Sequence, residues 1–327
     1  MLRIGVLGAA KITRGALLSP TRKIDDVSVV AVAARDPLRA ATYAQRHHIP
    51  VVFSSYEELL ASDDIDAVYI PLPAALHGRW AIAALRAGRH VLVEKPFAAN
   101  TEEAHIVAAV AGDTGLVAME AFHSLYHPLV AQLRSILDSG VLGTLETASA
   151  SFSVPIPPGR SIRWNESLGG GSLMDVGCYP LRLLQALFGY DATVLSATAS
   201  RRGQIDTSLN AVLAFPDIPH ATVFSSMWSH RLLGSRLEVV GTDGVLHARR
   251  PFTPQFGGRL RVRTATGRVT YPVDRGSTYG YQLNAFRDSI RHGTPIASPL
   301  AESVAMMRTI DELYEAAGMR RREPLPS

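Results

Sequence analysis

Apolar and polar positions alternate in two different ways along the chain, and the change falls near residue 120. In the first part, short and almost continuous apolar runs predict strands buried on both faces, and stretches with a period of three to four residues predict helices. The strands are expected at 2–7, 27–34, 51–53, 67–70, 91–93 and 116–119, and the helices at 13–18, 37–48, 56–62, 77–87 and 101–111. This order is typical of an α/β, doubly wound Rossmann-type parallel sheet.

After residue 120 the strands become longer, alternate more strictly, and are separated by turn residues such as those at 242–244 and 266–267. Strands are expected at 145–154, 193–201, 208–215, 221–229, 236–241, 246–249, 260–264 and 269–271, and helices at 128–139, 172–188, 281–292 and 301–316. The pattern predicts an α+β domain with a large, mostly antiparallel open sheet. We therefore expect a dinucleotide-binding domain at 1–122 and a substrate-binding and oligomerisation domain at 123–327. The open sheet face predicts a homo-oligomer, either a dimer or a tetramer.

Composition narrows the class of protein. With 47% hydrophobic and 19% charged residues over 327 positions, the chain has enough apolar material for a packed core. No apolar run is long enough to predict a membrane-spanning helix. Cys178 is the only cysteine, which argues against a disulfide framework and predicts a cytoplasmic protein. The net charge is +4 and the basic residues are scattered, so we expect no nucleic-acid partner.

The end of the first predicted strand has the features of a dinucleotide-binding turn. Such a turn brings backbone amides and a helix N-terminus close to the pyrophosphate. Gly8 provides the tight turn, Ala10 stands where a second glycine is usual, and Lys11 and Ile12 follow. The match to the glycine fingerprint is degenerate, and the alternating strands and helices after it support the interpretation.

The end of the second predicted strand indicates which dinucleotide is bound. Arg35 can bind a 2′-phosphate with its guanidinium and stack on adenine, and Arg39 lies one helical turn further on. Asp36 is followed by Pro37, a combination typical of a helix N-cap, so we assign Asp36 to capping. The expected cofactor is NADP, and use of NAD as well stays open.

Three further groups of residues are candidates for chemistry. Lysine occurs only at 11, 23 and 95, and Lys95 follows the fifth predicted strand at the sheet edge where ligands bind in open α/β folds. Asp175 and Tyr179 are four residues apart, which places them on one face of a helix. Arg163 and Trp164 precede the glycine run at 169–171 and are candidates for bordering the substrate. No metal site is expected, because the histidine spacing at 123 and 127 lacks a supporting carboxylate between the histidines and is followed by Pro128.

Three segments carry a resemblance to a known family. They are Ile-Pro-Leu-Pro-Ala-Ala-Leu-His at 70–77, Ala-Gly-Arg-His-Val-Leu-Val-Glu-Lys-Pro at 87–96 and Gly-Gly-Gly-Ser-Leu-Met-Asp-Val-Gly-Cys-Tyr at 169–179. Together they resemble the glucose–fructose oxidoreductase/inositol dehydrogenase (Gfo/Idh/MocA) family. The resemblance covers nearly the whole chain and is closest to the branch with dimeric dihydrodiol dehydrogenase, NADP-dependent xylose dehydrogenases and sugar ketoreductases. Ala10 departs from the family's glycine fingerprint.

The resemblance implies roles for several residues. It places Lys95 against the nicotinamide ribose and the reacting oxygen, Tyr179 at the proton-transfer position, and Pro71, Leu72, His77 and Glu94 beside the cofactor. Because a phenol is a poor base near neutrality, we expect the Lys95 ammonium to lower its pKa and Asp175 to orient one or both groups. The expected function is NADP(H)-dependent hydride transfer between nicotinamide and a secondary alcohol or carbonyl of a sugar or cyclic diol.

Two alternatives stay open on the same fold. The first is a non-catalytic NAD(P)-binding regulator, which would need neither Lys95 nor Tyr179. The second is an enzyme that recycles a tightly held cofactor between two sugars, and the lack of an N-terminal export signal argues against it.

Overall fold

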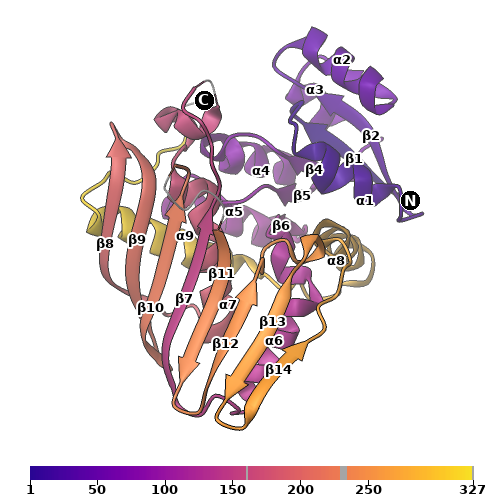
Figure 1. The fold of residues 1–327 in the computed structure, drawn as a ribbon. Helices are drawn as coiled ribbons and strands as arrows, with labels where there is room; N and C mark the ends of the chain where they lie inside the picture. Colours follow the sequence, from indigo (N-terminus) through magenta and orange to yellow (C-terminus); the bar gives the residue numbers. More distant parts are fainter. Residues whose placement is uncertain (160, 229–233, 326–327) are drawn as a thin grey trace. The chain divides into compact units, whose positions relative to one another are not determined.

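The computed structural model describes residues 1–159, 161–228 and 234–325 (Figure 1). By backbone contacts the chain forms two compact units, which are described separately. The first unit contains 1–123, 279–304 and 324–327, and the second contains 124–278 and 305–323. The first unit therefore includes a segment from the last sixth of the chain. The expected division into consecutive domains at residue 122 stays a prediction.

The first unit is built on a six-stranded parallel sheet with the strand order β3-β2-β1-β4-β5-β6. Its strands are β1 (Leu2–Leu7), β2 (Val27–Ala33), β3 (Val51–Phe53), β4 (Ala67–Ile70), β5 (His90–Val93) and β6 (Ala118–Glu120). Val6 pairs with Val32 on one side and Tyr69 on the other, and all three are fully buried. A sheet buried on both faces explains the near-continuous apolar runs. The expected doubly wound sheet is confirmed.

Helices connect these strands, and several begin at side chains that cap their first amides. They are η1 (Arg14–Leu18), α1 (Ser19–Thr21), α2 (Pro37–His47), α3 (Tyr56–Ala61), η2 (Ala74–Leu76), α4 (His77–Arg86) and α5 (Thr101–Thr114). A further helix, α8 (Thr278–His292), comes from late in the chain. Ser55 accepts from the amide of Glu58, and Asn100 from that of Glu103. From α8, Arg287 and Arg291 form ion pairs of 3.2 and 3.1 Å with Asp26, just before β2.

The second unit is built on an eight-stranded sheet with the order β14-β13-β12-β11-β7-β10-β9-β8. Its strands are β7 (Leu145–Ser153), β8 (Thr193–Arg202), β9 (Ile205–Phe215), β10 (Ile218–Ser226), β11 (Gly234–Gly241), β12 (Gly244–Arg249), β13 (Arg259–Thr264) and β14 (Gly267–Tyr271). The pairs are antiparallel except β7 with β10, which are parallel. The expected large, mostly antiparallel sheet is confirmed. The strand predicted at 221–229 ends at Ser226, and residue 229 lies outside the described residues.

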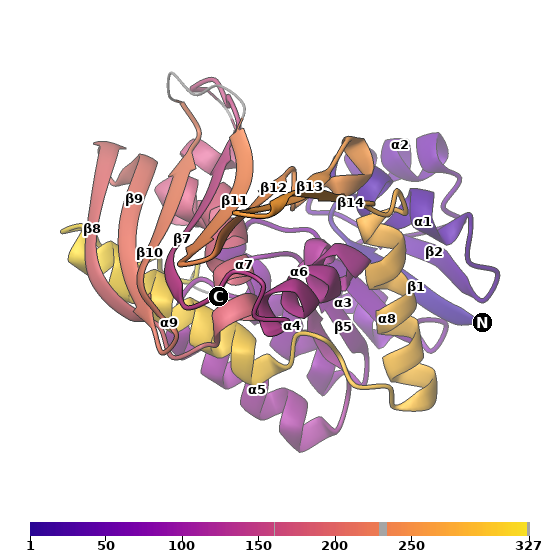
Figure 2. The same cartoon turned by 60° about the horizontal axis from the view of Figure 1, so that its bottom comes forward.

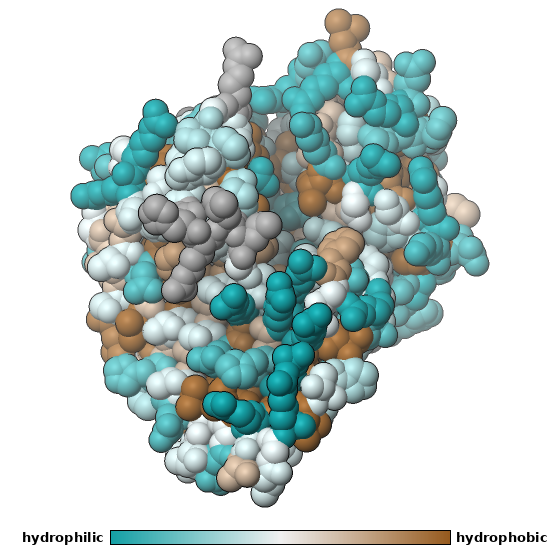
Figure 3. Space-filling model, in the orientation of Figure 1, coloured by the Kyte–Doolittle hydropathy of each residue, from teal (hydrophilic) through white to brown (hydrophobic). Residues whose placement is uncertain are grey.

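Helices cover one face of this second sheet (Figure 2). They include α6 (Pro128–Asp138), α7 (Cys178–Phe188), which η6 (Leu173–Gly177) precedes, and α9 (Leu300–Ala316). The chain also forms short 3₁₀ turns at η3 (His123–Tyr126), η4 (Ile162–Trp164), η5 (Glu166–Leu168) and η7 (Pro254–Phe256). The core lies between sheet and helices, where Leu184, Leu209 and Leu213 are fully buried. On the opposite face, His247 and Arg249 of β12 and the three arginines of β13 alternate with buried residues, and Figure 3 shows hydrophilic side chains gathered there.

Within the described residues, no helix has the length and apolar character to cross a membrane.

Candidate active site

The strand order of the first unit reverses between β1 and β4, which are neighbours. Gly8 follows the carboxyl end of β1, and Pro71 follows that of β4. In open parallel sheets, ligands bind outside the carboxyl ends of the strands at such a reversal. Gly8 and Pro71, two of the expected cofactor residues, therefore lie at the place where open parallel sheets bind ligands.

The turn at Gly8 needs a glycine for two reasons. Its backbone has φ +116°, a conformation that other residues rarely adopt, and an added Cβ would lie 3.0 Å from Cδ2 of Leu72. The turn is fastened to α2, because Arg39 donates to the carbonyl oxygen of Ala9 at 2.9 Å and Tyr43 to that of Ala10 at 3.1 Å. These bonds orient the peptide groups of the turn before the helical residues of η1 begin.

The segment after β2 contains the expected helix cap. Asp36 accepts hydrogen bonds from the amides of Leu38 at 3.0 Å and Arg39 at 3.3 Å, so it is the N-cap of α2. Arg35 and Arg39 are exposed, and so is Lys11 in the turn after β1. An anion bound at this edge would meet cations from two chain segments, which suits a phosphate.

His77 links the loop after β4 to the segment after β5. Its Nδ1 lies 2.7 Å from the carbonyl oxygen of Pro96, and its Nε2 lies 2.7 Å from that of Leu72. Burial lowers the pKa of His77 to about 4, the charge of Lys95 adds to this effect, and the two carbonyl oxygens oppose it. The neutral imidazole has an N–H on one nitrogen only, so it can donate to only one of the two carbonyl oxygens at a time. His77 therefore braces the two segments that carry Leu72 and Lys95.

Lys95 lies just after β5 and is half-buried, and the Lys95–Pro96 peptide bond is cis. Glu94, which precedes it, accepts a hydrogen bond of 2.6 Å from the hydroxyl of Tyr69 on β4. This bond joins two neighbouring strands at their carboxyl ends. The backbone that presents Lys95 is thus held from both sides, by Tyr69 through Glu94 and by His77 through Pro96.

Two more residues of the first unit belong to the surroundings of Lys95, and the sequence pattern assigned neither of them to this site. Burial and the charge of Lys95 lower the pKa of His123 to about 3. The ring of His123 stacks on Tyr279 with centroids 4.1 Å apart, and burial and the charge of Glu94 raise the pKa of Tyr279. Tyr279 lies 184 residues after Lys95 in the chain. Only the position of His123, three residues after the sixth strand, could have indicated a site residue.

The first unit fits a dinucleotide. The close approach of Leu72 to Gly8 leaves no room for a side chain in the turn, and a helical segment starts directly after it. The exposed cations Lys11, Arg35 and Arg39 provide charge for phosphates. Gly8, Ala10 and Ile12 with Pro71, Leu72, His77, Glu94 and Lys95 would line the remainder of such a site.

In the second unit, Asp175 and Tyr179 follow the glycine run at 169–171. The expected helix at 172–188 is present, but residues Leu173–Gly177 form a π-helical turn before the α-helix begins at Cys178. A π-turn has more residues per turn than an α-helix. The expectation that Asp175 and Tyr179 share one face of the helix stays a prediction. Tyr179 is 9% exposed, and its ring packs against Phe152 and Phe252 at centroid distances of 5.4 and 5.6 Å.

The structure brings two of the candidate residues of the second unit together. Arg163 Nε donates to Asp175 Oδ2 at 2.5 Å, and their side chains are 43% and 17% exposed. Trp164 is half-buried in the same short turn. Arg163 thus holds the carboxylate that was expected to orient Lys95 or Tyr179. Lys95 belongs to the first unit and Tyr179 to the second, so their meeting over the substrate stays a prediction.

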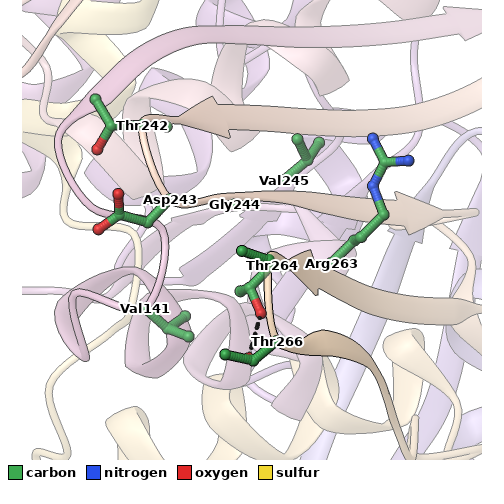
Figure 4. Close-up of a pocket in the computed structure, with 10 residues that line it drawn as sticks. Val141, Thr242, Asp243, Gly244, Val245, Arg263, Thr264 and Thr266 are labelled. Carbon is green, nitrogen blue, oxygen red and sulfur yellow. Dashed lines mark hydrogen bonds between the residues drawn. The ribbon is translucent and has the colours of Figure 1, made fainter.

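Over the described residues, no three His, Cys, Asp or Glu side chains are grouped as they would be around a metal ion. A surface hollow of about 610 Å³ lies at the ends of two hairpins, and Figure 4 shows Asp243 and Arg263 among its lining residues. The candidate residues line no part of this hollow, and we assign it no role in the reaction.

The sequence profile of the GFO/IDH/MocA oxidoreductase family, NAD-binding Rossmann fold, matches residues 2–122, and the profile of the GFO/IDH/MocA C-terminal domain matches residues 130–247. The chain belongs to this family. The expected resemblance is confirmed, and so is the expected class of enzyme, an NAD(P)-dependent oxidoreductase.

Three relatives show what the chain is similar to. D-xylose 1-dehydrogenase (NADP(+)) 2 of Haloferax volcanii is 35% identical over 97% of each chain. The dTDP-3,4-didehydro-2,6-dideoxy-alpha-D-glucose 3-reductase of Streptomyces antibioticus is 39% identical over 80% of this chain and 79% of its own. A crystal structure of a 3-ketoreductase from Actinomadura kijaniata, in complex with NADP and TDP-benzene, has a TM-score of 0.90 and 30% identity over 99% of each chain. NADP, the expected cofactor, is named for the first and is bound in the third.

Proposed function

We propose that the protein is an NADP(H)-dependent oxidoreductase that interconverts a secondary alcohol, or a lactol, and a carbonyl group on a sugar or cyclic diol. The joint presence of Lys95 at the carboxyl end of β5 and Tyr179 on α7 carries the proposal. The relatives support it, because the xylose dehydrogenase and the dTDP-sugar reductase act on hydroxyl or keto groups of sugars. Solved variants of the ketoreductase replace a lysine and a tyrosine, the two residue types assigned here.

The chain's own residues divide the work as follows. NADP, when bound, supplies the nicotinamide ring that accepts or donates the hydride. Tyr179 takes the hydroxyl proton in oxidation and returns it in reduction, and Lys95 lowers the pKa of its phenol and stabilises the developing alkoxide. Arg163 orients Asp175 through their ion pair, and Asp175 supports the proton-transfer pair. Trp164 and Arg163 border the sugar.

The test of these roles replaces one functional group at a time. Tyr179→Phe keeps the ring between Phe152 and Phe252, and Lys95→Ala removes the ammonium. We expect each to lower kcat by about 10²-fold or more on a substrate found by screening sugars, diols and keto-sugars at 340 nm. Lys23→Ala, which removes an exposed lysine of the same unit, is the control and should keep full turnover. Full turnover in Lys95→Ala and Tyr179→Phe would contradict the roles assigned to Lys95 and Tyr179.

The cofactor preference has its own test. NADPH and NADH are titrated against the protein and against Arg35→Asp, which we expect to lower NADPH affinity by about 10- to 100-fold and to change NADH affinity less. Arg46→Asp makes the same charge change at an exposed site near the other end of α2 and should leave the ratio of affinities unchanged. Tighter binding of NADH than of NADPH to the unmodified protein would contradict the proposal.

The regulator alternative is separated from the enzyme by the same screen. Binding of NADPH without any change in absorbance across the whole panel of substrates would favour it. The recycling alternative predicts cofactor that stays bound through gel filtration and is reduced by one sugar and reoxidised by another.

The oligomeric state is also proposed. We infer that the uncovered face of the second sheet joins copies of the chain into a dimer or tetramer. The β7, β9 and β10 strands present uncharged side chains there, among them Ser149, Asn210, Thr222 and Phe224, which alternate with buried residues. Light scattering after gel filtration should give a multiple of 35.3 kDa, and Phe224→Arg should reduce it. A monomer at micromolar concentration would contradict this. A cytoplasmic location stays a prediction.

A further inference from the structure

A buried ion pair lies in the second unit beside the glycine run that precedes Asp175 and Tyr179. Arg322, after α9, is 1% exposed, and Asp206, near the start of β9, is fully buried. Their Nη2 and Oδ1 atoms are 2.9 Å apart. Charged side chains are rarely buried to this degree unless their partners are held in a defined geometry.

Both members of the pair also bind the chain that leads into the helix of Tyr179. Arg322 Nε donates to the carbonyl oxygen of Gly170 at 2.8 Å. Asp206 Oδ2 accepts from the amide of Leu173 at 2.7 Å and from Ser172 Oγ at 2.8 Å. The Leu173 amide is the first of the π-helical turn, so Asp206 satisfies one of the amides that the start of a helix leaves without an internal partner.

The glycine run allows the backbone to lie close to Asp206. Gly171 has φ +132°, and a Cβ placed there would lie 2.0 Å from Oδ1 of Asp206. The backbone therefore approaches the carboxylate more closely than any residue with a side chain would allow. Four residues after Leu173, a Cβ on Gly177 would lie 2.8 Å from Oγ of Ser225 on β10. The turn is thus fitted to the sheet at both ends.

A third side chain encloses the pair. The hydroxyl of Tyr314 donates to Asp206 Oδ1 at 3.0 Å, and its ring centroid lies 4.4 Å from the guanidinium carbon of Arg322. Burial raises the pKa of Asp206, and the charge of Arg322 and the donors from Leu173, Ser172 and Tyr314 oppose this rise. The carboxylate is therefore matched by donors on each side.

An apolar cluster of similar volume would stabilise a fold at least as well as a buried ion pair, so stability alone is a weak reason for this arrangement. What the ion pair adds is a defined orientation of the backbone that it binds. A guanidinium fork and a two-oxygen carboxylate fix the positions of Gly170 and Leu173 through bonds of defined geometry. Asp175 and Tyr179 follow Leu173 by two and six residues on the same helical segment.

We propose that Asp206 and Arg322 are positioning residues, which set the orientation of residues 170–179 and thereby the reach of Asp175 and Tyr179 into the reaction. The proposal rests on the function proposed above. It predicts that disturbing the pair affects the chemical step and leaves cofactor binding, which depends on the first unit, unchanged.

The principal variant is Arg322→Lys, which keeps the charge but loses the fork that binds Gly170 and Asp206 together. We expect kcat to fall by about 10- to 100-fold, the affinity for NADPH to stay the same, and the pH profile of kcat/KM to shift. Arg321→Lys is the matched control, because the neighbouring arginine lies at the surface and pairs with Glu323 at 3.0 Å. It should match the unmodified protein in each measurement.

A double-mutant cycle of Arg322→Lys with Tyr179→Phe separates this proposal from the assignment of Tyr179 to proton transfer. If Arg322→Lys acts through Tyr179, it should lower kcat much less in the Tyr179→Phe background than in the unmodified protein. Full turnover of Tyr179→Phe itself would refute the proposed function. Low turnover of Tyr179→Phe with an undiminished effect of Arg322→Lys would refute the positioning role.

A milder variant covers the case in which Arg322→Lys does not fold. Tyr314→Phe removes one hydrogen bond to Asp206 and keeps the ring under the guanidinium. We expect a several-fold decrease in kcat with the same shift of the pH profile. A loss of stability in denaturant, with kcat and the pH profile unchanged for the folded protein, would show that the pair only stabilises the unit and would overturn the proposal.

Discussion

Acidification should destabilise the first unit through His77. In the native state burial lowers the pKa of His77 to about 4, whereas the ordinary value for histidine is 6.5. As the pH falls below 6.5, the unfolded chain binds a proton that the folded chain does not, so the unfolded state gains stability. The contribution of His77 is therefore complete above pH 6.5 and is lost as the pH falls towards 4.

The magnitude follows from the two pKa values. At about 1.4 kcal/mol for each pH unit between them, the loss reaches about 2.5 kcal/mol at pH 4.5 and about 3 kcal/mol at pH 4. His77 is almost fully buried, so solvent screening does not reduce this figure appreciably. A loss of this size is a large part of the free energy of unfolding of an ordinary protein.

The assay compares the protein with His77→Gln in urea at pH values from 7 to 4.5, followed by circular dichroism. Glutamine can donate to one of the two carbonyl oxygens and does not titrate. At pH 7 the variant should be the less stable, and the difference should shrink by about 2.5 kcal/mol at pH 4.5. His123, which burial also keeps neutral, is present in both proteins and cancels. A difference that stays constant with pH would show that His77 has the same pKa in the native and unfolded states, and a difference that grows as the pH falls would show that native His77 is protonated and donates to both Leu72 and Pro96.

Two other substitutions test local features. Asp36→Ala should lower the free energy of unfolding by about 1 kcal/mol through loss of the N-cap of α2, with the ratio of NADPH to NADH affinity unchanged, measured by urea denaturation and cofactor titration; a specific loss of NADH affinity would instead assign Asp36 to the ribose. Gly177→Ala should cost about 1–3 kcal/mol in the same denaturation assay, because its Cβ would collide with Ser225, and Ser225→Gly should recover part of this loss. An unchanged stability in Gly177→Ala would contradict the packing of the turn against β10.

Much of the fold could be predicted because its signals are local. The apolar runs of β1, β4 and β5 are sufficient by themselves to predict strands. Asp36 with Pro37 specifies a helix start within two residues. The parallel pairing of β7 with β10 was not predictable in this way, since pairing depends on partners about 70 residues apart. The π-turn at Leu173–Gly177 also escaped prediction, because a single insertion hardly alters the apolar period around it.

The residues of the candidate site also divide into those that local sequence could predict and those that it could not. Gly8, Arg35 and Lys95 could be selected because each stands within two residues of the end of a predicted strand. Asp206 and Arg322 could not be selected in this way, because they lie 116 residues apart in the chain. A charged residue considered alone is expected at the surface. Tyr279 was missed for the same reason, because no residue near it in the sequence indicates that it belongs to the surroundings of Lys95.

The place of α8 in the first unit has a consequence for biosynthesis. Asp26 lies 261 positions before its partner Arg287, and Leu283 and Phe286 of the same helix are fully buried. A ribosome releases the β1–β6 segment long before it makes α8, so the nascent nucleotide-binding half must wait, with part of its surface uncovered, until translation is almost over. Slow elongation in the intervening stretch would prolong that exposed interval and increase the demand for chaperones.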